Sequence, residues 1–314
     1  MKPIRIASRA SKLALAQTNI VKTSLKKLFP GLEISIVTIS TKGDRDKSDF
    51  LYKSESVGFF TSEVEKAILD GAADLAVHSL KDMPTAATPE LVIAAMPKRQ
   101  SPADALVASE KVASIKELPT GATIGTSSIR RISQLRHIRD DLKCVPLRGN
   151  VETRVRKVTT GQIDAIVVAC AGLNRLGLGD KISAVLRPEE FLTAPGQGAL
   201  AIQIRAGDTE LAELVSKLDD EPTRIATQTE RCVLAAMHGG CSIPLGVYAR
   251  IIGDRLAIDA MIADIDGKNL IKRSSSSPAS QSKVCAQKLA EELLEAGGKE
   301  ILERIKKSRK GFKP

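Results

Sequence analysis

Apolar and polar residues alternate along the first third of the chain in segments that predict strands and helices in turn. An apolar run over 3–7 precedes an amphipathic helical segment that continues to about Leu28, and residues 32–40 form an alternating segment rich in Ile and Val. A second helix is expected over 62–70, followed by a buried strand over 73–77. This alternation is typical of a parallel α/β sheet, which places ligands at the carboxyl ends of its strands.

The same pattern restarts after a polar connection around 98–104. The expected strands lie at 122–125, 143–147 and 164–169, and the expected helices at 128–139 and 151–159. From Pro222 the order changes to a helix ending near Met237, strands around 247–265, a Ser-rich connector at 274–277, and helices at 284–295 and 299–307. We therefore expect two similar α/β domains with a cleft between them and a third, α+β domain.

The glycine-rich segment 195–199 departs from the known nucleotide-binding loops and is interpreted as a crossover that returns the chain to the first domain. The expected domains are residues 1–98 with 199–218, residues 99–198, and residues 219–314. No apolar stretch approaches the roughly 18–20 residues that span a bilayer, and no signal-peptide block follows Met1. A cytoplasmic protein without a membrane partner is expected.

The charge balance indicates an anionic partner. The 314 residues include 47 Lys and Arg against 37 Asp and Glu, a formal net charge of +10. Aromatic residues make up only 3% of the chain, so the stacking surfaces that bind single-stranded nucleic acids are scarce. A smaller polyanion is therefore the better expectation.

The cysteines and histidines argue against a metal site, because five cysteines without CxxC spacing and three histidines form no ligand set. Cys241 follows Gly239 and Gly240, so its thiol is expected on a tight turn, as a nucleophile or an attachment point. The alternative is a small buried apolar residue, which is the commoner role of a cysteine.

Arginine recurs at the expected helix starts and strand ends, where guanidinium groups and helix N–H groups bind carboxylates. Any single one of them could equally be a solvated surface charge. Asp82 follows a buried strand and is a candidate for proton transfer, although a turn residue is the alternative from spacing alone. His78 and His137 have no partner at metal-ligand spacing and are interpreted as structural or hydrogen-bonding residues.

Six motifs occur in order along nearly the whole chain. They are RIASRAS at 5–11, AVHSLKDMP at 76–84, GTSSIRR at 125–131, LRGNV at 147–151, AGLNRL at 171–176 and GGCSIP at 239–244. In this order they resemble the porphobilinogen deaminase (hydroxymethylbilane synthase) family. The resemblance implies two α/β domains like those of type II periplasmic binding proteins, plus a third α+β domain.

The resemblance also implies an activity. Members of the family join four porphobilinogen units head to tail, release four ammonia molecules and hydrolyse off linear hydroxymethylbilane. Their primer is a dipyrromethane cofactor held through a thioether by the cysteine that matches Cys241, because a soft thiolate captures an electrophilic azafulvene in a stable bond. A monomer that passes its product to uroporphyrinogen III synthase is implied.

The residues that match the family's functional positions fall into three sets. Asp82 matches the catalytic carboxylate, which binds pyrrole N–H groups and assists proton transfers. The expected cofactor-binding residues are Cys241, Lys81, Asp82, Ser127, Arg130, Arg131, Arg148 and Gly149. The expected substrate-binding residues are Arg9, Ser11, Ser79, Arg154, Arg175 and Gln197. Each porphobilinogen carries two carboxylates, so the growing chain needs repeated cationic groups.

One loop departs from the family pattern. Members usually have a Gly-Gly-Lys-Gly-Leu-Phe stretch, whereas this chain has Glu55, Ser56 and Val57 before Gly58, with Lys53 and Phe60 as the remaining loop candidates. A less positive and stiffer loop is expected to alter lid motion, substrate affinity or elongation rate.

Two other functions remain open from the residues alone. A non-catalytic protein that binds anions in the same cleft would need neither Asp82 nor Cys241. A nucleic-acid-binding protein is suggested only by the charge and would show steeply salt-dependent binding.

Overall fold

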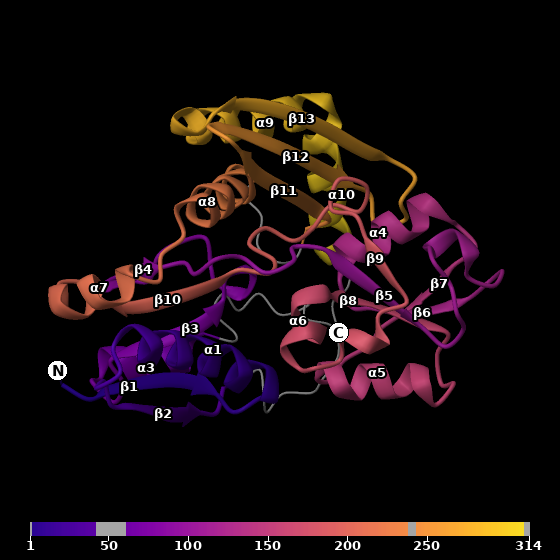
Figure 1. Ribbon diagram of the computed structural model, residues 1–314. Helices are drawn as coiled ribbons and strands as arrows, with labels where there is room; N and C mark the ends of the chain where they lie inside the picture. The colour runs from indigo at the N-terminus through magenta and orange to yellow at the C-terminus, as the bar shows by residue number, and fades with distance from the viewer. Residues whose placement is uncertain (1, 42–60, 238–242, 311–314) are drawn as a thin grey trace. The chain divides into compact units, whose positions relative to one another are not determined.

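The structure is a computed structural model that describes residues 2–41, 61–237 and 243–310 (Figure 1). The chain divides into two compact units. The first unit holds one five-stranded sheet, and the second holds another five-stranded sheet and a three-stranded sheet. Within these described ranges, every helix is too short or too polar to cross a membrane.

The sheet of the first unit has the strand order β2-β1-β3-β10-β4. Its strands are β1 (Ile4–Arg9), β2 (Ile34–Ile39), β3 (Leu75–Ser79), β4 (Leu91–Ala95) and β10 (Leu200–Arg205). Its helices are α1 (Lys12–Leu28), α3 (Ser62–Leu69) and α7 (Thr209–Ser216). Apolar residues of α1 and α7 pack on one face of the sheet and those of α3 on the other, because successive strand side chains point to opposite faces.

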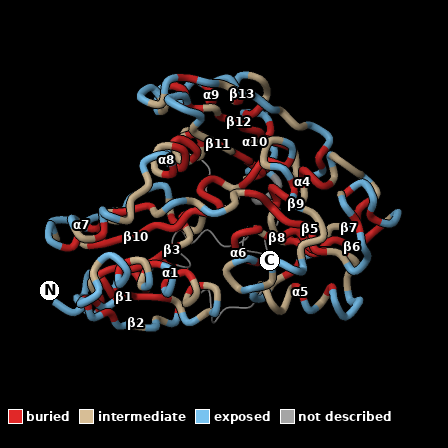
Figure 2. The backbone as a smooth tube through the Cα atoms, in the orientation of Figure 1, coloured by how far each residue is buried: buried red, intermediate tan, exposed pale blue. Residues whose placement is uncertain are grey.

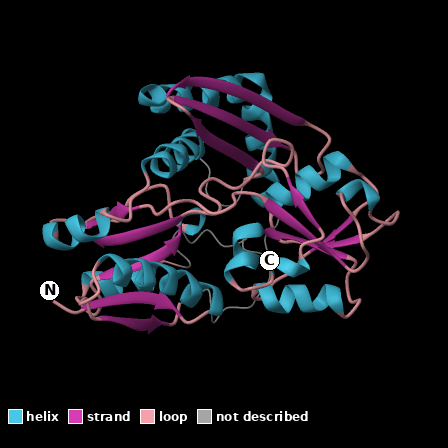
Figure 3. Ribbon diagram, in the orientation of Figure 1, coloured by secondary structure: helices cyan, strands magenta, loops and turns pink. Residues whose placement is uncertain are grey.

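The larger sheet of the second unit has the strand order β7-β6-β8-β5-β9. Its strands are β5 (Asp104–Ala108), β6 (Thr123–Gly125), β7 (Lys143–Val145), β8 (Ala165–Ala169) and β9 (Ala184–Leu186). Its helices are α4 (Ile129–Ile138), α5 (Val151–Thr159) and α6 (Cys170–Arg175). Leu135 of α4 packs on one face of the sheet, whereas α5 and α6 pack on the other (Figure 3).

The two large sheets share one topology, which confirms the expectation of two similar α/β domains. The sheets are mixed, however, and the expectation of parallel sheets was wrong for one strand in each. β10 runs antiparallel to β3 and β4, and β5 runs antiparallel to β8 and β9. A strand-helix-strand crossover makes two neighbouring strands parallel. Neither β5 nor β10 is joined by such a crossover to a strand beside it.

The glycine-rich segment 195–199 returns the chain to the first sheet, as expected, because β10 begins at Leu200. Gly198 has φ +88, and a Cβ there would lie 2.6 Å from the carbonyl oxygen of Ser101. The Gly198 carbonyl oxygen also accepts a hydrogen bond from the Gln100 backbone N–H at 3.3 Å. The outgoing and returning segments therefore touch backbone to backbone, at a distance that only glycine allows.

The three-stranded sheet has the order β11-β12-β13. Its strands are β11 (Leu245–Ile252), β12 (Arg255–Ala263) and β13 (Leu270–Pro278), and the neighbouring helices are α8 (Glu221–Ala236), α9 (Ser282–Leu293) and α10 (Lys299–Lys310). Apolar side chains of β11, β12, α8 and α9 form one core. In Figure 2 the backbone of β11 and β12 is mostly red, as expected for strands that contribute to this core.

The Ser-rich segment 274–277, expected as a connector, is part of strand β13. Its residues pair in antiparallel register with β12, and Ser274 Oγ donates a hydrogen bond to Asp259 Oδ1 at 2.5 Å. Serines are tolerated here because β13 lies at the edge of the sheet, where polar side chains remain in contact with water. The local composition of residues 274–277 therefore predicts a loop, but their pairing with β12 makes them part of a strand.

Candidate active site

Predicted functional residues lie at the ends of two neighbouring parallel strands. Arg9 is the last residue of β1 and Ser79 the last residue of β3, and a short 3-10 helix, Leu80–Asp82, follows β3 directly. Parallel strands end at the same edge of a sheet, so these side chains gather there. The expected position of Asp82 after a buried strand is confirmed.

Arg9, Ser79 and Asp82 line one small pocket together with Gln17 and His78. Gln17 Nε2 donates a hydrogen bond to Ser79 Oγ at 2.8 Å, which orients the serine hydroxyl. The pocket therefore presents a guanidinium group, a hydroxyl and a carboxylate within one unit. Such a set binds a ligand that carries both an acidic group and an N–H group.

Ser11 does not line this pocket; it is the N-cap of α1, and its hydroxyl accepts a hydrogen bond from the Ala14 backbone N–H at 3.3 Å. Ser11 therefore caps the first turn of α1. Ser8 Oγ instead donates to the Arg9 carbonyl oxygen and accepts from Thr18 Oγ1 at 2.9 Å.

His78 is held by a buried chain of hydrogen bonds. Gln203 Nε2 donates to Glu65 Oε1 at 3.0 Å, so Gln203 Oε1 faces His78 Nε2, also at 3.0 Å. Because an amide oxygen only accepts, His78 Nε2 carries the proton. Burial lowers the pKa of His78 to about 4, although Glu65 and Asp82 act in the opposite direction, and the imidazole is neutral at pH 7.

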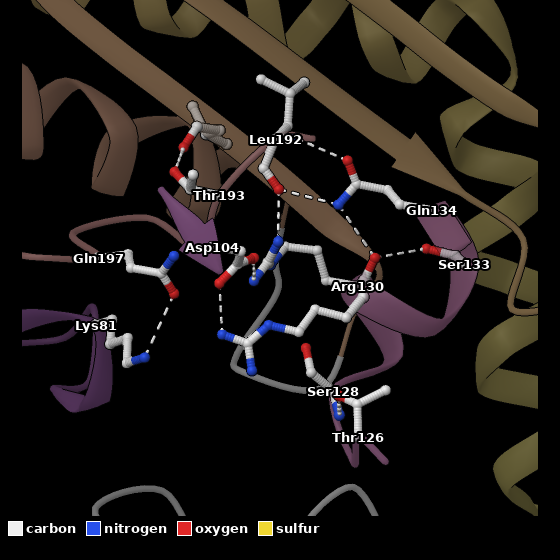
Figure 4. A network of polar contacts seen from close by, with 12 residues as sticks. Lys81, Asp104, Thr126, Ser128, Arg130, Ser133, Gln134, Leu192, Thr193 and Gln197 are labelled. Atoms are coloured by element: carbon white, nitrogen blue, oxygen red, sulfur yellow. Dashed lines mark hydrogen bonds and ion pairs between the residues drawn. The ribbon is translucent and has the colours of Figure 1, made fainter. Parts of the chain in front are cut away.

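Lys81 and Gln197, predicted for different sets, contact each other. Lys81 Nζ donates a hydrogen bond to Gln197 Oε1 at 3.4 Å (Figure 4). The Gln197 carbonyl oxygen accepts from Arg99 Nε at 2.7 Å. The returning segment 195–199 thus supplies a polar side chain beside the 3-10 helix that carries Asp82.

In the second unit, a buried carboxylate holds two of the predicted arginines. Asp104 is fully buried and accepts from Arg130 Nη2 at 2.8 Å and from Arg131 Nη2 at 2.6 Å. Arg130 Nη1 also donates to the Leu192 carbonyl oxygen at 2.6 Å (Figure 4). Burial acts to raise the pKa of Asp104, but the charges of the two arginines outweigh it and hold the pKa below its usual value.

Two like charges of the second unit act on the guanidinium group of Arg154. Burial, followed by the charges of Arg131 and Arg148, lowers the pKa of Arg154 to about 10. Arg148 Nε is buried and has no hydrogen-bond partner among the described residues. Burial also lowers the pKa of Arg175, at the end of α6, to about 10. This arginine cluster, Arg131, Arg148 and Arg154, is a site for an anion with several acidic groups.

Local backbone contacts hold this cluster in place. Ser127 Oγ donates to the Leu147 carbonyl oxygen at 3.0 Å and lies 3.1 Å from the Leu147 backbone N–H, which fixes the residue before Arg148. Arg154 Nε donates to the Gly149 carbonyl oxygen at 2.8 Å, so the predicted residues 148, 149 and 154 are connected through one turn.

Several residues of these arrangements were not predicted from the sequence. Asp104, Gln17 and Gln203 belong to none of the six motifs. An aspartate at the start of an otherwise apolar strand, as at Asp104, is nevertheless a signal for a buried ion pair. Cys241, Lys53, Phe60 and the altered loop residues lie outside the described residues.

Comparisons with known proteins identify one family. The family model described as the porphobilinogen deaminase, dipyromethane cofactor binding domain matches residues 4–213. The model of the porphobilinogen deaminase C-terminal domain matches residues 225–295. Together the two models include all three sheets.

Similar curated proteins carry the same family name. A porphobilinogen deaminase of Maridesulfovibrio salexigens is 45% identical over 305 residues, 97% of this chain and 99% of that protein. One of Roseiflexus castenholzii is 44% identical over 299 residues, 95% of this chain and 98% of that protein.

Solved structures similar to the chain include a TRAP periplasmic solute binding protein of Desulfovibrio salexigens, 11% identical with a TM-score of 0.41 over 69% of this chain and 72% of that one. They also include an arginine-specific periplasmic binding protein of Salmonella typhimurium, 9% identical with a TM-score of 0.39 over 71% and 94% of the two chains. The sequence comparisons, which extend over nearly the full length of the chain and of its relatives, decide the assignment. The chain belongs to the porphobilinogen deaminase family.

Proposed function

We propose that the protein is a hydroxymethylbilane synthase, a transferase of tetrapyrrole biosynthesis. It condenses four porphobilinogen molecules head to tail, releases four ammonia molecules and hydrolyses off the linear tetrapyrrole. The family match over nearly the whole chain supports this activity. The structural observation that supports this activity most directly is the arginine cluster, because its like charges suit a ligand with several negative charges.

The residues of the cluster fit a dipyrromethane cofactor, whose two pyrrole units carry two carboxylates each. Arg148 Nε is buried and lacks an acceptor among the described residues, so a carboxylate would remove the cost of an unsatisfied buried donor. The residues that would hold the group are Arg131, Arg148, Arg130, Ser127 and Gly149, with Lys81, Asp82 and the covalent link at Cys241. When bound, the cofactor supplies the primer to which the first substrate pyrrole is joined.

The proposed role of Asp82 is to hold pyrrole N–H groups and to move protons during loss of ammonia and ring coupling. It lines a pocket with Arg9 and Ser79, which would bind an acidic side chain of the same substrate. Neutral His78 adds no positive charge to this pocket, where Arg9 supplies the cationic group. Arg154, Arg175, Ser11 and Gln197 are proposed as further substrate-binding residues.

We also propose the finer points of organisation. The three domains are residues 1–98 with 199–218, 99–198 and 219–314, each containing one sheet. The protein acts as a cytoplasmic monomer that passes its product to uroporphyrinogen III synthase. The family resemblance supports both the monomer and the downstream partner.

The test is the intact mass of the purified protein with the Ehrlich colour reaction for a bound dipyrromethane. We expect the mass of two condensed pyrrole units on the wild type and on Cys232→Ser, a matched cysteine control, and none on Cys241→Ser. Asp82→Asn should keep the added mass and lose about 10²–10⁴-fold in kcat with porphobilinogen, the range of general acid-base catalysis.

Two results would contradict the proposal. One is a wild-type protein that stays unmodified after incubation with porphobilinogen and consumes none of it. The other is Cys241→Ser that carries the same added mass as the wild type.

A further inference from the structure

The hydroxyl group of Thr61 is a buried polar group for which the described residues supply no hydrogen-bond partner. Thr61 is 1% exposed and occupies the N-cap position of α3, where a threonine normally accepts a hydrogen bond from a backbone N–H of the first turn. Its side chain makes no such bond, and Thr61 Oγ1 has no hydrogen-bond partner among the described residues. A buried hydroxyl without a partner is destabilising, so something other than the helix is expected to bind it.

Thr61 lines the same pocket as Arg9, Ser79 and Asp82. The pocket has a volume of about 30 Å³. This is room for about two water-sized groups, which is about the size of a carboxylate. The pocket therefore suits the end of an acidic side chain whose ring lies outside it.

The polar groups of the pocket favour a carboxylate. The Arg9 guanidinium supplies positive charge, and the neutral imidazole of His78 supplies none. Ser79 Oγ accepts from Gln17 Nε2, so its own proton is directed away from Gln17 and can be donated. Thr61 and Ser79, which carry hydroxyl groups, and Arg9, which carries a guanidinium, all line this space together with Asp82.

We propose that Thr61 is a substrate-binding residue whose hydroxyl donates a hydrogen bond to a carboxylate oxygen of the acetate or propionate side chain of porphobilinogen. This inference rests on the proposed function, because it takes porphobilinogen as the substrate. In this arrangement the acidic side chain faces Arg9 and Thr61, and the N–H groups of the same substrate face Asp82. Thr61 thereby sets which way the pyrrole enters the site.

The test compares Thr61→Val, which replaces the hydroxyl by a methyl group of similar size, with Thr61→Ser, which keeps the hydroxyl. We expect Thr61→Val to raise KM for porphobilinogen about tenfold with little change in kcat, the effect of losing a hydrogen bond to a charged group. Thr61→Ser should keep the wild-type KM. The melting temperature of Thr61→Val should equal or exceed that of the wild type, because the Thr61 hydroxyl makes no hydrogen bond within the described part of the chain.

A second ligand distinguishes the groups that Thr61 could bind. Calorimetric titration with a pyrrole that carries the acetate and propionate groups but no aminomethyl group should show about tenfold weaker binding to Thr61→Val. Thr88→Val is the control for structural effects, because the Thr88 hydroxyl donates to Glu65 Oε2 at 3.0 Å and does not line the pocket. It should lower the melting temperature and leave the affinity for the analogue unchanged.

Three outcomes would overturn the inference. Unchanged KM and unchanged analogue affinity in Thr61→Val would mean that water alone satisfies the hydroxyl. A raised KM with unchanged analogue affinity would place the hydroxyl at the aminomethyl nitrogen. Equal effects of Thr61→Val and Thr61→Ser would mean that shape matters and the hydroxyl does not. A wild-type protein that binds the analogue without consuming porphobilinogen would instead contradict the proposed function, and the analogue titration would still test Thr61.

Discussion

Replacement of Asp104 by asparagine tests whether a buried carboxylate holds the arginines of the second unit. Asp104 is fully buried and lies 2.8 Å from Arg130 Nη2 and 2.6 Å from Arg131 Nη2. Asp104→Asn keeps the size of the side chain but removes the negative charge that pairs with two buried guanidinium groups. Breaking a buried ion pair costs about 3–5 kcal/mol, a large part of the roughly 5–15 kcal/mol that stabilises a typical protein.

The assay is urea and thermal unfolding of the purified protein. We expect the free energy of unfolding to fall by about 3–5 kcal/mol. The melting temperature should fall by about 10 °C, since each kcal/mol shifts a domain of this size by a few degrees. The matched control is Asp180→Asn, which breaks an exposed pair with Lys181, at 2.7 Å, and should leave stability unchanged.

The pH dependence gives a second measurement. The folded-state pKa of Asp104 is lowered from 3.8, so its contribution to stability is present above pH 3.8 and is lost as the pH falls below that value. Asp104→Asn should lack this acid-dependent part of the unfolding free energy. A loss of less than about 1 kcal/mol at pH 7, the range of exposed pairs, would refute the reasoning.

Two further predictions concern the first unit. The pKa of buried His78 is about 4 in the folded protein and 6.5 in the unfolded chain, so the unfolded chain binds a proton first as the pH falls. The wild type should therefore lose about 2 kcal/mol of stability from pH 7 to pH 5. His78→Gln, measured by urea unfolding at both pH values, should not show this loss, and an equal loss in both proteins would argue against it. Gly198→Ala should destabilise the protein by about 1–3 kcal/mol through a positive φ and a backbone clash. Gly207→Ala, at the same φ of +88 but with open space around it, should cost clearly less in the same assay, and equal costs would exclude the clash.

Most helices could be predicted from the sequence because their patterns are local. Helix α5 was expected over 151–159 and is found there, since its apolar positions and the Asn150 cap lie within a few residues of one another. The ends of β1 and β3 were likewise expected to carry Arg9 and Asp82, because a buried apolar run followed by polar residues marks the end of a strand.

Other elements depended on partners far away in the chain. The Ser-rich segment of β13 has the composition of a loop, and only its pairing with β12 makes it a strand. The antiparallel direction of β5 and β10 was not predictable for the same reason. Each strand takes its direction relative to a partner that is distant in the chain, β8 for β5 and β3 for β10.

Local patterns in the amino-acid sequence were enough to indicate the family, most of the helices and several of the strands, and the residue types proposed to bind acidic pyrroles, but not strands β4, β5, β9 and β10. The tertiary structure alone decided which of those residues meet. Asp104 pairs with arginines 26 and 27 positions away, and Thr61, whose hydroxyl has no hydrogen-bond partner among the described residues, becomes a candidate only because it lines a pocket at the ends of β1 and β3. The physical reason is that periodicity and capping act over a few residues, whereas burial, ion pairing and pocket shape depend on segments that only folding brings together.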